Sequence, residues 1–282
     1  MRTRKKVSNT IAYIVLVLIS IIWLFPFVCL VLQSFRSYIT ELGGMVDYLL
    51  PKKFSLDSYK FLFSGETKFL KWYGNTLIIA LFVSIGQTAF VLCVSYALSR
   101  MRFKGRELLM RFWLILGMFP GFLTMICLYF LLKQFGLTQA GAVPGLILIS
   151  VASSGMGYYV CKGYFDTIPK SLDEAARIDG SGEFRTFNNI VLPIMKPAIA
   201  VQAIFTFVSS WNNYFVPALI LKSDKKKTLP ILIAQLRSAD WLKFDMGQVY
   251  MMIAFSIFPV IIVYIILSRY IVQGIALGAV KG

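Results

Sequence analysis

Histidine is absent from this chain of 282 residues, and acidic side chains are scarce, with 13 Asp and Glu against 29 Lys and Arg. Without histidine the chain lacks the commonest general base and metal ligand, which disfavours most hydrolases and metalloenzymes. It also has no GxxxxGK[ST] phosphate loop, so we do not expect it to bind ATP itself. Four cysteines without CxxC spacing are interpreted as small hydrophobic residues, not as a disulfide framework or a zinc site.

Apolar residues, by contrast, are abundant. Hydrophobic residues make up 58% of the chain and the mean hydropathy is +0.72, whereas a soluble domain has about 45–50% apolar residues. The excess indicates a membrane protein. The formal charge of +16 lies largely in short segments between apolar runs. Membrane topology and anionic lipid head groups explain that charge better than nucleic acid does, since no nucleic-acid reading module is recognisable.

Six long apolar runs predict an all-α, polytopic membrane protein with six transmembrane helices. Charged residues are missing from their cores, apart from Arg111 at the edge of the third run. That absence argues against an ion-coupled secondary transporter, because ionisable residues inside the membrane carry proton and sodium relays. The predicted spans are 11–32, 75–98, 108–132, 143–160, 197–221 and 249–267.

The chain therefore divides into three predicted parts. Residues 1–74 hold the first span and an external segment, residues 75–270 form the transmembrane core, and residues 271–282 form a tail. The N-terminus and the link 99–107 are the densest short basic segments. Because basic residues concentrate in short cytoplasmic segments, both termini are expected in the cytoplasm.

A polar passage, Asp173–Pro193, separates two of the apolar runs and carries helix signals. Ser171 and Glu174 have the spacing of a capping box, which predicts a helix beginning at Leu172. Gly180 permits a left-handed stop, after which a second short helix is expected to begin at residue 181 and end before the proline. The sequence predicts a helix-turn-helix with two exposed alanines, at 175 and 176, that let another surface approach closely.

The same passage carries a spaced pattern of seven residues that resembles the EAA motif of ABC importer permeases. The motif consists of Glu174-Ala175-Ala176, three residues, Gly180, nine residues, and then Ile190-x-Leu192-Pro193. Its surroundings, PKSLDEAARIDG and LPIMKPA, resemble the carbohydrate-uptake branch, in particular the smaller permease subunit of maltose/maltodextrin systems. The alternative is an ordinary amphipathic hairpin between two spans. We call residues 171–193 the coupling segment.

This resemblance implies that a separate ATPase docks on a cytoplasmic coupling segment and supplies the energy. It implies contact roles for Glu174, Ala175, Ala176, Asp179, Gly180, Leu192 and Pro193. The implied partners are a second permease subunit, two ATP-binding subunits, an extracellular solute-binding protein and membrane lipid, with no nucleic acid. ATP and Mg would be bound by the ATPase, and no cofactor by this chain. The implied location is a bacterial cell membrane.

Candidate substrate-path residues lie at mid-depth of the fifth predicted span, the most polar of the six, where Thr206, Ser209 and Ser210 are followed by Trp211, Asn212, Asn213 and Tyr214. Amides bond hydroxyl groups and aromatic rings stack on the C–H face of a sugar, so the set suits a neutral sugar or oligosaccharide. The alternative that these amides form interhelical hydrogen bonds is equally open. Gln87 and Gln202 are weaker candidates for the same path, and packing contacts are the favoured interpretation of both.

Two further segments have roles implied only by the resemblance. Residues 222–248, with a basic cluster and Trp241, would face the extracellular binding protein, and the tail 273–282 would extend along the ATPase interface. Without the resemblance they are a solvated loop and a tail of small residues. Competing functions are a permease for another neutral polar solute, or a membrane enzyme or scaffold outside the ABC importers.

Overall fold

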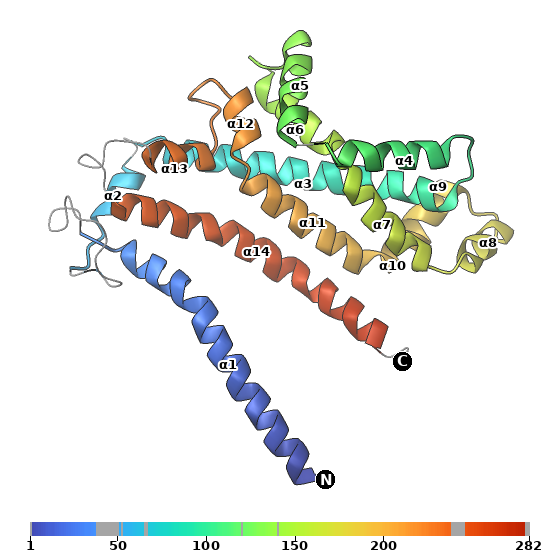
Figure 1. Cartoon of the computed structure of the whole chain (residues 1–282), viewed down its shortest axis with the longest axis horizontal. Coiled ribbons are helices and arrows are strands. Elements are labelled where there is room, and N and C mark those ends of the chain that lie inside the picture. Colours follow the sequence, from blue (N-terminus) through green and yellow to red (C-terminus); the bar gives the residue numbers. More distant parts are fainter. Residues whose placement is uncertain are drawn as a thin grey trace. The chain divides into compact units, whose positions relative to one another are not determined.

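The computed structural model describes residues 2–37, 51, 53–64, 67–119, 121–139, 141–237 and 246–279. Most of this part of the chain is helical, and the β pairing within it is a single bridge between Arg36 and Phe54. Figure 1 labels the helices, which are α1 (Arg2–Gln33), α2 (Asp57–Phe63), α3 (Phe69–Arg100), α4 (Arg106–Gly117), α5 (Gly121–Gln134), α6 (Ala142–Ala152), α7 (Gly155–Thr167), α8 (Ser171–Ile178), α9 (Glu183–Thr186), the π segment η1 (Phe187–Val191), α10 (Leu192–Ile194), α11 (Lys196–Trp211), α12 (Phe215–Ile220), α13 (Leu229–Arg237) and α14 (Met246–Ala279).

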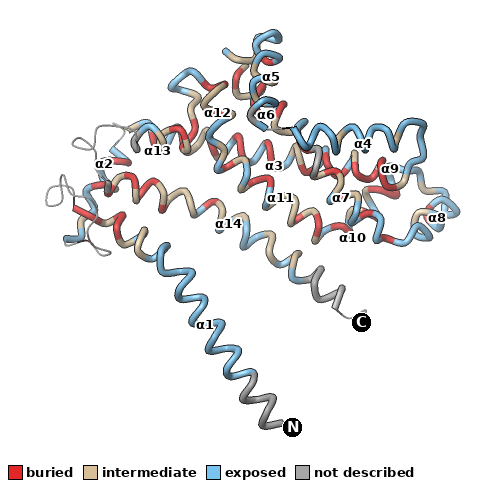
Figure 2. Tube along the Cα trace, viewed as in Figure 1, coloured by how far each residue is buried: buried red, intermediate tan, exposed pale blue. Residues whose placement is uncertain are grey.

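The chain forms two compact units, which we describe separately. The first unit combines Met1–Leu70 with Leu232–Phe258. Its α1 exposes large apolar side chains along most of its length, as Figure 2 shows, which suits a helix surrounded by lipid. A cluster of aromatic rings closes the other end of this unit, where Phe255 lies edge-on to Phe63 and Phe69 at ring-centre distances of 5.5 and 6.1 Å.

The second unit combines Lys71–Ile231 with Pro259–Gly282 and holds two hydrophobic clusters. One cluster packs the last turns of α3 against α7 and the η1 segment, and includes Tyr96, Phe165 and Val191. The other packs the first half of α3 against α6 and α12, and includes Val83, Leu146 and Ile220. The long helix α3 therefore contributes residues to both clusters and connects them.

The helices account for up to five membrane spans by length and composition. Three are single helices (in α1, α3 and α14), and two are bent pairs, in which α6 is followed by α7 and 183–194 is followed by α11. The expected all-α polytopic class is confirmed, but the count of six is not. The run 108–132 was predicted as one span interrupted at Pro120 and Gly121, and the structure has two helices there, since α4 ends at Gly117 and α5 begins at Gly121. Pro120 lies between them in the sequence, and the residue before a proline disfavours helical backbone.

Candidate functional site

The coupling segment turns at Gly180 as its sequence predicts. Gly180 has a φ of +75°, in the left-handed region that residues with a side chain rarely adopt. Its N–H bonds the carbonyl of Arg177 at 3.0 Å, and the N–H of Ser181 bonds the carbonyl of Ala176 at 2.8 Å. These two bonds form a Schellman motif, which satisfies two carbonyls at the end of α8.

The start of α8 differs from the predicted capping box. The helix begins at Ser171, one residue before the expected start, and Lys170 is the N-cap without any side-chain hydrogen bond. The carbonyl of Lys170 instead accepts the backbone N–H groups of Asp173 and Glu174 at 3.0 and 3.1 Å. Because the backbone already occupies these donors, the Ser171 hydroxyl makes no cap.

The two alanines of the motif differ in exposure, and the prediction that both are exposed is wrong. Ala175 is exposed, but Ala176 is 4% exposed and is the buried residue of α8. A helix that rests on the protein must bury one face, and a small residue allows a close approach there. Glu174, Asp179 and Gly180 are exposed on the rest of the turn.

The second half of the coupling segment also departs from its prediction, which ended the helix before Pro193. The helical path continues from α9 through η1 and α10 to Ile194, and then meets α11 at an angle of 81°. In η1 the N–H of Leu192 bonds the carbonyl of Phe187, the wider turn of a π helix. Proline crowds the carbonyl four residues before it in a regular helix, and the wider turn relieves that crowding. Leu192 is half-buried and Pro193 is exposed.

Charged and polar side chains hold the coupling segment against α3. Arg100, the last residue of α3, places Nε 3.0 Å from the Asp173 carboxylate and donates from Nη2 to the carbonyl of Ile168 at 2.9 Å. At the other end, Glu183 forms an ion pair with Arg177 and accepts a long hydrogen bond of 3.4 Å from the Tyr96 hydroxyl. The hydrogen bond and charge of Glu183 raise the pKa of Arg177 above its usual value, so this guanidinium stays protonated.

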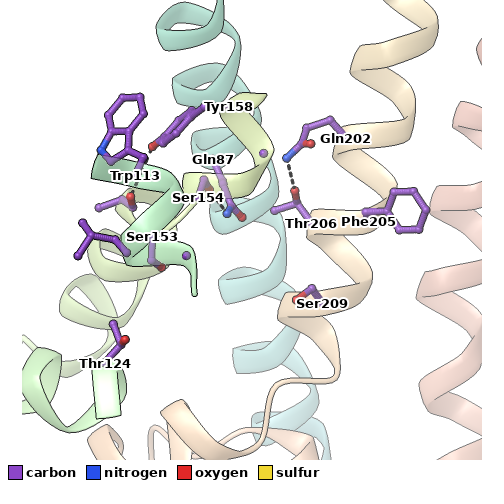
Figure 3. Close-up of a pocket in the computed structure, with 14 residues that line it drawn as sticks. Gln87, Trp113, Thr124, Ser153, Ser154, Tyr158, Gln202, Phe205, Thr206 and Ser209 are labelled. Carbon is purple, nitrogen blue, oxygen red and sulfur yellow. Dashed lines mark hydrogen bonds between the residues drawn. The ribbon is translucent and has the colours of Figure 1, made fainter. Parts of the chain in front are cut away.

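A cavity of about 590 Å³ lies between α3, α7 and α11 (Figure 3). Its walls carry hydroxyl and amide groups beside aromatic rings, and no charged side chain lines it. Gln87 donates to the Ser154 hydroxyl, and Gln202 donates to the Thr206 hydroxyl at 3.1 Å. We call it the polar cavity, and its lining residues are Gln87, Trp113, Leu116, Gly117, Thr124, Ala152, Ser153, Ser154, Gly157, Tyr158, Gln202, Phe205, Thr206 and Ser209.

Helix breaks meet at the polar cavity. Ser153 and Ser154 form the break between α6 and α7, and Gly117 ends α4, so irregular backbone lies beside the cavity from two directions. Backbone without helical hydrogen bonds is tolerated at membrane depth where it is buried in protein or lines a watery space. A second cavity of about 190 Å³ shares Gln87, Ser153, Thr206 and Ser209 with the first and extends to Asn213.

The four predicted path residues are divided by the structure. Trp211 is 2% exposed and packs on Phe207 and Tyr73, with ring centres 5.8 and 5.4 Å away, so it faces the protein interior. Asn213 lines the smaller cavity, and its side-chain oxygen accepts the N–H of Val216 at 3.4 Å.

Asn212 and Tyr214 are exposed beyond the end of α11, and neither lines either cavity. The segment 211–214 is therefore a turn between α11 and α12, not the middle of a continuous helix.

The polar cavity was missed because its residues come from distant parts of the sequence. One signal was available, since Gln202, Thr206 and Ser209 have the spacing of a single helix face. Gln87 donates a hydrogen bond to Ser154 and lines both cavities. No single-helix pattern shows that α3 will lie opposite α11, where Ser84 donates to the carbonyl of Ala203 at 2.9 Å.

Two other predicted segments are only partly described. In 222–248, the Asn75 amide donates to the carbonyls of Lys225 and Lys227 at 3.0 and 2.9 Å, which ties the basic cluster to the start of α3. Trp241 lies outside the described residues. The tail 273–282 is helical to residue 279, but its side chains and its last three residues lie outside the described part. Within the described residues, no group of three or more His, Cys, Asp or Glu could hold a metal ion.

Comparison with protein families matches residues 91–277 to the family described as binding-protein-dependent transport system inner membrane component. The arabinooligosaccharides transport system permease protein of Bacillus subtilis is 34% identical over 270 residues, which cover 94% of this chain and 93% of that protein. The maltodextrin transport system permease protein of the same organism is 32% identical over 286 residues, covering 99% of each.

One solved structure shares the fold at a TM-score of 0.77 and 24% identity, and the match covers 94% of this chain and 96% of that one. It is the crystal structure of a bacterial ABC transporter involved in the import of the acidic polysaccharide alginate. At this identity the likeness concerns the fold.

Proposed function

The chain belongs to the family of binding-protein-dependent transport system inner membrane components, and we propose that it forms half of the pore of an ABC importer for a neutral sugar or oligosaccharide. The family resemblance predicted from the motif in 174–193 is thereby confirmed. Relatives named as permeases for arabinooligosaccharides and maltodextrin match nearly the whole chain, which supports sugar as the solute class.

The observation that carries the solute class is the polar cavity. Its uncharged hydroxyls and amides can exchange hydrogen bonds with sugar hydroxyls, and Trp113 and Tyr158 offer apolar ring surface beside them, with ring centres 4.8 Å apart. A charged solute would have no counter-charge there, and burying an unpaired charge is costly. The cavity therefore favours a neutral solute over an acidic or basic one.

Energy reaches this subunit through the coupling segment. Exposed Glu174, Asp179 and Gly180 form the surface on which a separate ATPase docks, with exposed Ala175 permitting close contact. Leu192 and Pro193 shape the second half of the segment. ATP and Mg bind to the ATPase and not to this chain, and closure of two ATPase subunits moves α8 and switches the pore from inward-facing to outward-facing. The segment and both termini then lie in the cytoplasm of a bacterial cell membrane.

A second permease subunit completes the pore, and an extracellular solute-binding protein delivers the solute. Residues 222–248 would meet that protein outside the cell, and lipid surrounds the spans. The composition of the two regions supports this division of roles, because the coupling segment carries charged residues on α8, on α9 and at Asp179, whereas no charged residue lines the polar cavity.

Reconstitution tests the proposal. The four components are assembled in vesicles, and uptake of radiolabelled maltodextrin and arabino-oligosaccharide is compared with that of an acidic oligouronide of the same length. We expect ATP-dependent uptake of at least one neutral glycan and a nucleotide-binding subunit that co-purifies after gentle solubilisation. Uptake of the oligouronide in preference to both neutral probes would overturn the solute class, and absence of the ATPase would overturn the importer.

Another neutral polar solute is the second candidate, because amides and hydroxyls also bond peptides. A competition assay separates the two: excess unlabelled tripeptide should leave sugar uptake unchanged, whereas excess unlabelled oligosaccharide should abolish it.

A further inference from the structure

We propose that Arg100 is a positioning residue that transmits the movement of α8 to α3, so that the coupling segment acts on the polar cavity through α3 as well as through the helices that follow it in the chain. The inference rests on the proposed function. Sequence order alone connects the coupling segment to α7 before it and α11 after it. Arg100 and Tyr96, both on α3, add a third connection, and of these two Arg100 is the one that contacts α8 itself.

The contacts of Arg100 span both sides of the entry to α8. Its guanidinium lies 3.0 Å from the carboxylate of Asp173 in the first turn of α8, and it donates at 2.9 Å to the carbonyl of Ile168, just before the helix. The Arg100 side chain is 4% exposed and the Asp173 side chain 14%. The contact with Ile168 is a hydrogen bond and the contact with Asp173 is a close ion pair, so one planar guanidinium joins two points at the start of α8, whereas a lysine ammonium is a single point charge.

The Arg100–Asp173 pair is poorly suited to stabilising the fold. Nε and Nη1 of Arg100 and both carboxylate oxygens of Asp173 are buried without an aligned hydrogen bond within the described residues, so the pair is held by charge and not by hydrogen bonds. A buried ion pair of this kind contributes little stability relative to apolar residues of the same volume, because removing the charges from water is costly. Its geometry fits a device that sets the position of α8 relative to α3.

Movement of the last turn of α3 would reach the polar cavity. Gln87 lies on the same helix, about 20 Å before Arg100 at roughly 1.5 Å per residue, and lines the cavity. Two further bonds join α3 to α7: the Ser99 hydroxyl donates to Asp166 at 2.6 Å, and the Ser95 hydroxyl donates to the carbonyl of Tyr158 at 3.0 Å. Both helices carry cavity residues, so displacing α8 would move two walls together.

The chain offers a matched control pair. Glu107 and Arg111 form an ion pair on α4 at 3.9 Å, with side chains 87% and 78% exposed. It has the same charges as the Arg100–Asp173 pair, but solvent screens it and it joins residues of one helix. Loss of this pair removes a charge without cutting a connection between α3 and α8.

The test is a double-mutant cycle in the assembled importer, with its second permease, ATPase and binding protein in vesicles. The measurement is labelled maltodextrin or arabino-oligosaccharide taken up per ATP hydrolysed, together with the amount of ATPase that co-purifies. We expect Arg100→Gln and Asp173→Asn each to lower uptake per ATP by about tenfold, and the double variant by about the same tenfold, because one connection is cut in all three. Co-purification of the ATPase should be unchanged.

Losses that multiply to about a hundredfold in the double variant would overturn the pairing, since independent residues add in free energy. Unchanged uptake per ATP would overturn the transmission role, and so would an equal loss in Glu107→Gln or Arg111→Gln. If the single variants reach the membrane in reduced amount, Arg100→Met/Asp173→Leu keeps the volume without charge. We expect it to assemble normally but to lose uptake per ATP, and normal uptake per ATP would contradict the proposal. A wild-type chain that fails to co-purify with the ATPase would instead overturn the proposed function.

Discussion

The coupling segment and the polar cavity belong to the same unit of the chain but differ in their side chains and in what holds their helices in place. In the coupling segment, short helices are fixed by a left-handed glycine and by ion pairs, and most side chains of α8 are exposed. In the cavity, long helices are fixed by aromatic and aliphatic packing, and the exposed groups are uncharged. A surface that receives a partner and a space that accepts a neutral solute therefore need different side chains.

Because the two regions are held together differently, different substitutions should damage them. Backbone geometry decides the shape of the coupling segment, because three- to eight-residue helices bury little apolar surface of their own. Packing decides the shape of the cavity, because its polar groups would not hold long helices together. Substitutions that alter packing should damage the cavity side first, and substitutions that alter backbone dihedrals should damage the coupling segment first.

Trp211→Ala should have the largest effect, and it tests whether packing holds the helices around the polar cavity. The side chain is 2% exposed and stacks on Phe207, on the opposite face of α11 from the cavity residues. Truncating a buried tryptophan costs about 3–5 kcal/mol in cavity and transfer energy, so we expect a large drop in the melting temperature of the purified chain in detergent. Phe82→Ala, at a side chain 62% exposed on α3, is the control and should change it little. Similar melting temperatures for both variants would mean that packing does not hold α11.

The coupling segment was the more predictable region because its signals are local. The motif residues and Gly180 lie within one short stretch, and the glycine adopts the predicted φ. The errors there concern tertiary contact: Ala176 is buried because α8 must rest on the protein, and the π turn at η1 carries the helix past Pro193.

The polar cavity was far less predictable, since it needs α3, α7 and α11 to meet. Periodicity identified the apolar helices but not their neighbours. Residue type placed Trp211 with the path residues, although its indole packs inward. The spacing of Gln202, Thr206 and Ser209 shows in the sequence that they share a helix face. The sequence does not show that Gln87 and Ser154 line the same cavity.

Gly180→Ala tests whether backbone geometry decides the shape of the coupling segment. A side chain at a φ of +75° costs about 1–2 kcal/mol, so the Schellman turn should open and association with the ATPase should weaken by about tenfold. Gly180→Leu should act in the same direction while membrane insertion stays intact. Gly182→Ala is the control, because its φ of −74° suits any residue and a Cβ there meets nothing within 4 Å. Equal ATPase co-purification from both alanine variants would show that the left-handed turn is dispensable.

Gln87→Met tests whether solute uptake and ATPase association can be separated, because it changes the chemistry of the cavity wall and not its volume. It removes the hydrogen bond to Ser154 and leaves that hydroxyl beside an apolar group. A lost neutral hydrogen bond is worth about 1 kcal/mol, so sugar uptake should fall about fivefold with ATPase co-purification unchanged. Gln139→Met, at an exposed position outside both cavities, should leave uptake as it was. A loss of ATPase association in Gln87→Met would mean that the two regions are not separable.

Tyr96→Phe should have the smallest effect, and it tests whether backbone or side chains hold the coupling segment. The hydroxyl lies 3.4 Å from Glu183, at the long limit of a hydrogen bond, whereas the ring packs on Phe187 and Phe165 at 4.7 and 5.8 Å. Because phenylalanine keeps the ring and Glu183 keeps Arg177, we expect uptake and ATPase association within about twofold of wild type, under roughly 0.5 kcal/mol. A tenfold loss of uptake or of ATPase association would mean that the Tyr96 hydroxyl holds α9 in place. The coupling segment would then depend on side-chain contacts as strongly as on the turn at Gly180.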